Sequence, residues 1–196
     1  AVELLKRLLA ERVSLYQKTN IVQAEKFSDL LNRSLSSYLK GLLTNEEVIQ
    51  ELLNLAKEIS SSESAGNDLG LTREEKSFYD ALTKPQAVQD VYTNEQLVAM
   101  TKELTEALRK NRTIDWQKKE SARAGMRKMI KRLLKKYHYP PEEAANALET
   151  VIRQCEQWTD NEDTASEPKL YSLQESSYSM AAEPKTEYGN VKNKTK

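Results

Sequence analysis

The sequence is poor in the residues that build disulfide bonds and metal sites. Its 196 residues include one cysteine and one histidine. A single cysteine excludes an internal disulfide and a multi-cysteine metal site, and a single histidine excludes a metal site built on several histidines. Cys155 lies on an apolar helical face, which predicts a core residue in the reducing environment of the cytoplasm.

Long apolar runs are absent as well. No apolar stretch approaches the roughly 20 residues needed to span a bilayer, so we expect no membrane segment. No signal peptide is visible, and the chain starts at Ala1, within a helical pattern and without an initiator methionine. We therefore interpret the chain as a piece of a longer cytoplasmic polypeptide.

Glycine and proline are scarce, at five residues each, and runs of β-branched residues are absent. Apolar residues recur at spacings of three and four almost everywhere, which predicts an all-α fold. We expect an irregular bundle of about seven or eight helices with a polar C-terminal tail. Thr44, Thr72 and Thr93 are each followed three residues later by Glu or Gln, a pattern that marks helix starts.

Composition divides the chain into four segments. Residues 1–62 form a helical segment, and residues 63–70 form a linker within a stretch rich in serine, glycine and asparagine, SSSESAGNDLG. Residues 71–158 form a C-terminal helical domain. Residues 159–196 form a polar tail that we expect to be partly disordered or packed back onto the helices.

The charges are balanced in total but strongly partitioned along the chain. Residues 102–136 carry 13 basic and 4 acidic side chains, whereas residues 1–101 carry 11 and 15 and residues 137–196 carry 6 and 11. Such segregation is typical of proteins that dock on charged partners. Pairing of the basic segment with the acidic segments of its own chain explains it equally well, so both interpretations stay open.

Most of the excess cations lie on one helix, predicted from about Trp116 to Tyr137. They form two neighbouring rows at a spacing of four residues, which can contact DNA phosphates or an acidic protein surface. Within this stretch only Asp115 and Glu120 precede the rows, so the helix screens its own charge weakly. The predicted contact residues are Arg123, Arg127, Lys128, Lys131, Arg132, Lys135 and Lys136.

Three aromatic residues near the ends of this helix are candidate docking anchors. Aromatic side chains dominate the energetics of many interfaces, and Trp116, Tyr137 and Tyr139 are the candidates here. A core position is the stronger expectation for Trp116, and the two interpretations are even for Tyr139.

Signatures of catalysis are absent from the sequence. It contains no glycine-rich phosphate loop, no His or Cys set with metal-ligand spacing, and no Gly-x-Ser-x-Gly motif. Acidic pairs such as Glu46 and Glu47 fall in first helical turns, where capping explains them. We interpret His138, which lies between two tyrosines, as a structural residue at a helix C-terminus. We predict no catalytic, cofactor or metal site in this chain.

Several runs of the sequence resemble a known family. The run LTREEKSFYDAL from Leu71 and the run RKNRTIDWQKKESARAGMRKMIKRLLKKYHYPP from Arg109 resemble the helical C-terminal region of the restriction (motor) subunit of type I restriction-modification enzymes. The upstream runs NIVQAEKFSDLLNRSL and EVIQELLNLAKEI resemble the helical part just before it. The resemblance covers residues 1–158, and its elements FYDAL, TIDW, ESARA and KRLLKKYHYPP occur in order.

The resemblance implies a longer subunit that acts as an ATP-dependent type I site-specific deoxyribonuclease. Such subunits have a metal-dependent nuclease domain and two RecA-like motor domains that hydrolyse ATP with magnesium and pump DNA. No catalytic motif of the family can be placed on this sequence, so we expect a non-catalytic part. Its expected partners are the methyltransferase and specificity subunits, together with the motor and nuclease domains of its own chain. The alternative is a module in which the basic helix 116–137 binds the backbone of duplex DNA.

Overall fold

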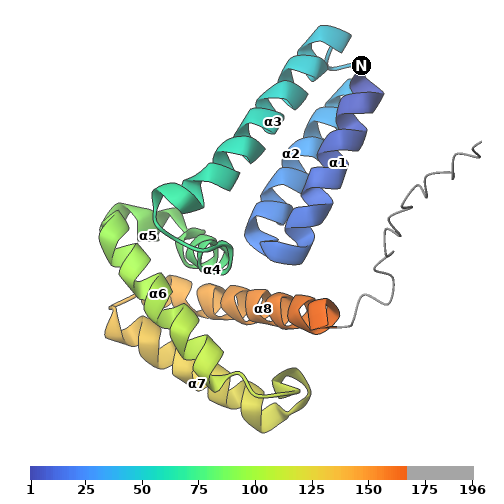
Figure 1. Cartoon of the computed structure of the whole chain (residues 1–196). Coiled ribbons are helices and arrows are strands. Elements are labelled where there is room, and N and C mark those ends of the chain that lie inside the picture. The colour runs from blue at the N-terminus through green and yellow to red at the C-terminus, as the bar shows by residue number, and fades with distance from the viewer. Residues whose placement is uncertain (167–196) are drawn as a thin grey trace, which may run out of the picture. The chain divides into compact units, whose positions relative to one another are not determined.

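The computed structural model describes residues 1–166, and the side chains of residues 1–160. The all-α prediction is confirmed, because the described residues form helices and no strand (Figure 1). The α-helices are α1 (Val2–Thr19), α2 (Ile21–Leu39), α3 (Asn45–Asp68), α4 (Arg73–Thr83), α5 (Gln86–Val91), α6 (Asn94–Asn111), α7 (Glu120–Lys136) and α8 (Pro141–Ser166). A short 3-10 helix, η1 (Trp116–Lys118), precedes α7.

The predicted helix starts are confirmed where side chains cap the backbone. Thr44, Thr72 and Thr93 each accept a hydrogen bond from the backbone N–H three residues later, and the Glu or Gln at that position bonds back. These capping boxes satisfy N–H groups that have no partner within the helix. Pro141 begins α8, a position where its missing N–H costs no hydrogen bond.

The predicted linker at residues 63–70 is wrong as secondary structure, because α3 continues to Asp68. The Ser61 and Ser64 hydroxyls donate to carbonyls of the preceding turn, so these residues fit within a helix. Gly66 is buried, and a Cβ atom at this position would lie 3.4 Å from the Lys76 side chain. Gly66, near the end of α3, thus lies against the Lys76 side chain of α4. The division of the chain into four segments stays a prediction.

The start of the predicted tail at Thr159 is also wrong, because α8 continues to Ser166. Trp158 donates from Nε1 to the Ser77 hydroxyl at 2.8 Å, and the Thr159 hydroxyl donates to the Cys155 carbonyl at 2.9 Å. The first contact attaches the end of α8 to α4, a tertiary effect that composition does not reveal, and the second lies within α8 itself. The rest of the predicted tail, residues 167–196, lies outside the described residues.

The buried apolar residues form two clusters. One joins α1, α2 and α3 and contains Leu9, Val13, Phe27, Leu31, Val48, Leu52, Leu55 and Ile59. The other joins η1 and helices α4 to α8, and its largest members include Trp116, Phe78, Met100, Leu104, Ile130 and Ile152. Cys155 belongs to the second cluster, so its predicted core position is confirmed. Helices α4 and α8 lie between the α1–α3 group and the α6–α7 pair (Figure 1).

Polar contacts join the two clusters around the buried Asp80 of α4. Its carboxylate accepts hydrogen bonds from Asn20 at 2.7 Å and from Gln23 at 3.1 Å, and it also pairs with Lys76. Nearby, the Gln154 amide of α8 accepts from the Ile21 N–H and donates to the Thr19 carbonyl. Several hydrogen bonds on one carboxylate offset the cost of its burial.

Replacing Asp80 by alanine should destabilise the fold strongly. The change leaves Lys76, whose side chain is only 14% exposed, as an uncompensated buried charge. Removing one partner of such a pair costs about 3–5 kcal/mol. Urea denaturation followed by circular dichroism measures the loss. The matched control is Glu106→Ala, which breaks an exposed ion pair with Lys110 and should cost about 0.5 kcal/mol or less. Equal losses in the two variants would contradict a central role for Asp80.

Candidate charged interaction surface

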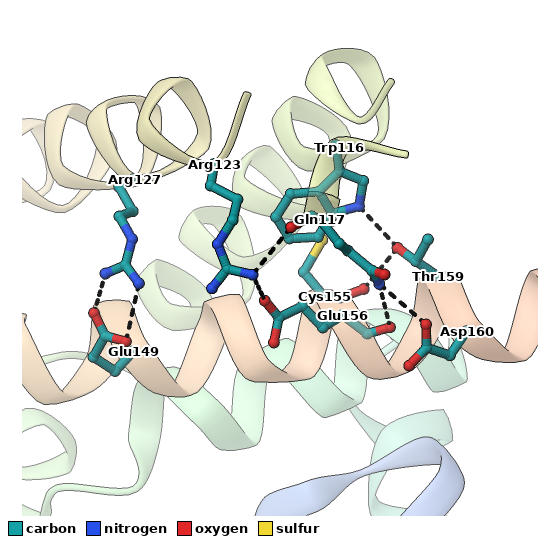
Figure 2. A network of polar contacts seen from close by, with 9 residues as sticks. All are labelled: Trp116, Gln117, Arg123, Arg127, Glu149, Cys155, Glu156, Thr159 and Asp160. Carbon is teal, nitrogen blue, oxygen red and sulfur yellow. Dashed lines mark hydrogen bonds and ion pairs between the residues drawn. The ribbon is translucent and has the colours of Figure 1, made fainter. Parts of the chain in front are cut away.

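Two of the seven predicted contact cations are engaged by α8 (Figure 2). Arg123 donates to the Glu156 carboxylate at 2.6 Å, and Arg127 forms an ion pair with Glu149. The hydrogen bond that Arg127 donates to Glu149 raises the pKa of Arg127, and the charge of this carboxylate acts in the same direction. These ion pairs join α7 to α8. The two arginines are therefore paired within the chain.

Lys136, at the other edge of the basic face, is engaged by α6. Its ammonium donates to Glu103 Oε1 at 2.6 Å, while the Tyr137 hydroxyl donates to Glu103 Oε2 at the same distance. The hydrogen bonds from Lys136 and Tyr137 lower the pKa of Glu103. Ion pairs inside the molecule therefore match part of the basic charge. Pairing within the chain was one of the two interpretations that the sequence left open.

The other four predicted contact residues form an exposed surface, which we call the basic strip. Its members lie on the side of α7 opposite the buried Met126, Ile130 and Leu133. Their side chains make no ion pair with any residue in the described part of the chain, and Ala124 and Gly125 extend the same exposed face. The basic strip consists of Lys128, Lys131, Arg132 and Lys135.

Two of the three candidate docking anchors are core residues. Trp116 is fully buried, and its Nε1 donates to the Thr159 hydroxyl at 3.1 Å (Figure 2). Tyr139 is 5% exposed and donates to the Leu82 carbonyl at 2.6 Å, and burial raises its pKa. Neither side chain has a face from which to contact a partner in this fold, so both are corrected as docking anchors. The core position that was the stronger expectation for Trp116 is the one observed, and Tyr139 takes the core position of its two interpretations. Tyr137 is half-buried against Glu103.

Backbone turns explain why these aromatic residues point inward. Asp115 has φ +56° and His138 has φ +57°, both in the left-handed region. After α7, the N–H of His138 bonds to the Lys135 carbonyl and that of Tyr139 to the Leu134 carbonyl. This arrangement reverses the chain at a helix C-terminus and directs the next side chain back toward the helix. It also supports the structural role predicted for His138.

Glu103, Glu149 and Glu156 complete this surface and were missed by sequence reasoning. Each lies 22 to 34 residues from the cation or tyrosine that it contacts. For Glu149 and Glu156 the signal is the acidic composition of residues 137–196, which does not identify partners, and no such signal marks Glu103 within the basic segment. Among the described residues, no group of three or more His, Cys, Asp or Glu side chains could hold a metal ion. No described helix is both long and apolar enough to cross a membrane.

The comparisons with known proteins agree with the resemblance seen in the sequence. The model of the family described as "Type I restriction enzyme HindI endonuclease subunit-like, C-terminal" matches residues 1–161. The chain belongs to this family. The type I restriction enzyme HindI endonuclease subunit of Haemophilus influenzae is 38% identical over 156 residues, which are 80% of this chain and 15% of that protein.

A second relative is more distant. The putative type I restriction enzyme MjaIXP endonuclease subunit of Methanocaldococcus jannaschii is 30% identical over 135 residues, which are 68% of this chain and 13% of that protein. The matched region therefore spans less than a sixth of either relative. No solved structure matches the chain.

The contact between Tyr137 and Glu103 should give a distinct titration. The hydrogen bond to Glu103, aided by burial, raises the pKa of Tyr137 to about 12 from 10.0. The folded state thus holds this proton more tightly than the unfolded state. The contact's contribution to stability is complete below pH 10 and is lost as the pH rises toward 12.

Replacing Glu103 by glutamine should lower the pKa of Tyr137 toward 10.0, because the charged acceptor is removed. The change is measured as tyrosinate absorbance against pH, after subtraction of the Tyr137→Phe titration. Glu106→Gln, one turn away on the same helix, is the control and should leave the curve unchanged. An unshifted transition in Glu103→Gln would show that the carboxylate does not set this pKa.

Proposed function

We propose that the chain is the non-catalytic C-terminal part of the endonuclease subunit of a type I restriction enzyme, an ATP-dependent DNA translocase and endonuclease of the cytoplasm. It acts in assembly with the methyltransferase and specificity subunits and in communication between the motor and nuclease domains of its own chain. The basic strip carries the proposal, because its four cations are exposed and make no ion pair with the described residues.

The surroundings of the basic strip suit it to recognition. Ion pairs at both edges of α7 fix the helix against α8 and α6, so the strip is held on a rigid support. A positive surface of this kind accelerates encounter with an acidic surface and disfavours wrong partners. We expect the complementary acidic surface on the methyltransferase core.

By the same proposal, ATP and magnesium serve other parts of the longer subunit. The described residues do not fit these groups, because they offer no cluster of carboxylate or histidine ligands for a metal. None of the glycines falls in the pattern G-x-x-x-x-G-K-[ST] of a phosphate-binding loop. No step of ATP hydrolysis or DNA cleavage is assigned to residues 1–166.

Reversing the charge of the basic strip should weaken binding to the methyltransferase core. The test variant carries Lys128→Glu, Lys131→Glu, Arg132→Glu and Lys135→Glu, and calorimetry measures its affinity for the core without DNA. We expect a loss of about tenfold or more, since like charges would then face each other across the contact. Circular dichroism checks that this variant and the control variant described next remain folded.

The control variant makes the same change in net charge elsewhere, at four exposed cations that make no ion pair within the described structure. It should bind the core nearly as tightly as the unaltered chain. If the two variants lost affinity equally, the effect would be one of net charge, and the basic strip would not be the contact surface. The control carries Arg33→Glu, Lys40→Glu, Lys57→Glu and Lys102→Glu.

Duplex DNA is the second candidate partner, favoured by the linear arrangement of the basic strip. From Lys128 to Lys135 the strip is about 10 Å long at 1.5 Å per residue. Such a surface contacts phosphates and gives affinity with little sequence preference.

DNA binding through the strip predicts a steep dependence on salt. Each phosphate neutralised contributes about 0.9 to the slope of log affinity against log salt concentration, so four contacts give a slope of roughly −3 to −4. Fluorescence anisotropy with a labelled duplex measures this slope. The charge-reversed strip should remove it, and the control variant should keep it. A steep slope that persists without the strip would place the DNA contact elsewhere on the chain.

A further inference from the structure

Helix α1 carries more apolar surface than its neighbours cover. Leu9 and Val13 are buried against α2 and α3, and Leu5 and Tyr16 pack partly against the same cluster. Three further leucines of α1 remain exposed. They are Leu4 at 62%, Leu8 at 51% and Leu15 at 52% exposure.

These three residues lie on one side of the helix, with the exposed Glu11 on the same side between Leu8 and Leu15, and we call the three the leucine row. At about 100° per residue, positions 4, 8 and 15 fall within about 40° of one another, and the row is roughly 16 Å long. It lies at a wide angle from the buried Leu9 and Val13, so α1 has two apolar sides. A surface helix normally has one, and exposed apolar residues gathered in a row mark contact sites. In Figure 1, α1 lies at the outer edge of the α1–α3 group.

The leucine row ends at a hollow with positively charged walls. Leu15 lines a cavity of about 470 Å³ between α1, α3 and the start of α4. Arg12, Lys18, Arg73 and Lys76 line the same cavity with the Glu63 carboxylate, and the charge of Lys76 is matched by Asp80. Arg12 pairs with Glu63 at 3.6 Å, whereas the exposed Arg73 makes no ion pair within the described structure. The hollow therefore suits a carboxylate at the end of an apolar contact.

We propose that the leucine row and this hollow hold an amphipathic helix from the preceding part of the same subunit, with an apolar stripe and an acidic end. The family model is C-terminal, and the matched region is 15% and 13% of the two relatives, so most of each relative lies outside it. A segment of the same polypeptide has a high effective concentration at this surface.

The inference rests on the proposed place of the chain in a longer subunit, and it does not depend on the basic strip. The leucine row belongs to the α1–α3 cluster, whereas α7 belongs to the cluster of α4 to α8. The two surfaces therefore serve different partners, one within the subunit and one in the methyltransferase core or on DNA.

Thiol accessibility tests the proposal in the full-length subunit. Leu8→Cys is compared between that subunit and the 196-residue chain, with maleimide labelling of the α1 peptide read by mass spectrometry. The native Cys155 is 1% exposed and lies in a different peptide. We expect labelling to be slower by about tenfold or more in the full-length subunit, because a covered thiol reacts only when the contact opens.

The matched control is Leu39→Cys at the end of α2, where the leucine is 83% exposed and outside the leucine row. Its labelling rate should be the same in the two proteins. Equal labelling rates for Leu8→Cys in the two proteins would overturn the proposal. It would also be overturned if Leu8→Cys and Leu39→Cys were slowed equally in the full-length subunit. Protection of Leu8→Cys that rises with concentration in the 196-residue chain alone would assign the surface to a second copy and also overturn it.

Arg73→Glu tests the charged end of the contact. Introduced with Leu8→Cys in the full-length subunit, it should raise the labelling rate toward that of the 196-residue chain, because an acidic partner would be repelled. If Leu8→Cys stayed equally protected from labelling, the claim that the proposed helix has an acidic end would be wrong. If the leucine row is protected while the methyltransferase core does not bind the chain, the assembly role fails and this inference stands.

Discussion

The arrangement of the described helices depends on α8, which contacts a different partner on each of its sides. Its apolar side, with Val151, Ile152 and Cys155, lies in the core shared by helices α4 to α8. Its carboxylates pair with arginines of α7, and its Gln154 amide binds the turn between α1 and α2. Arg153 of α8 and Lys84 both bind Glu25 of α2. Burial alone would raise the pKa of Glu25, but the hydrogen bonds from these two cations hold this pKa below its usual value. One helix therefore fixes the relative positions of both clusters and of the basic strip.

The helix starts with capping boxes could be predicted from the sequence, whereas the ends of α3 and α8 could not, because the two depend on different interactions. For α7 the predicted end near Tyr137 is right within a residue, but the helix begins at Glu120 and not at Trp116, which lies in the separate η1. A capping box is local, so Thr44, Thr72 and Thr93 identify helix starts from four residues each. The ends of α3 and α8 depend on tertiary contacts, which include the close approach of Gly66 to Lys76 and the hydrogen bond from Trp158 to Ser77. Serine and glutamate are tolerated in a helix whose other side is packed, and composition does not distinguish that case from a linker.

The candidate site was predictable in its charges but not in their pairing. Periodicity placed the seven cations on one face of one helix, and α7 presents them there. Which of them stay free depends on Glu103, Glu149 and Glu156, which reach α7 only through the packing of α6 and α8 against it. The inward positions of Trp116 and Tyr139 depend on backbone turns at Asp115 and His138, two non-glycine residues with positive φ that no sequence pattern marks.

The physical difference between the basic strip and the leucine row indicates different kinds of contact. Lysine and arginine side chains are well hydrated, so the strip is stable in water and suits the reversible contact proposed for it. Exposed leucines gain free energy only when they are covered, at roughly 25 cal/mol for each Å² removed from water, and they suit a contact that persists. A permanent contact at α1 and a reversible one at α7 would let a single rigid body, held together by α8, transmit force between the rest of its subunit and an external partner.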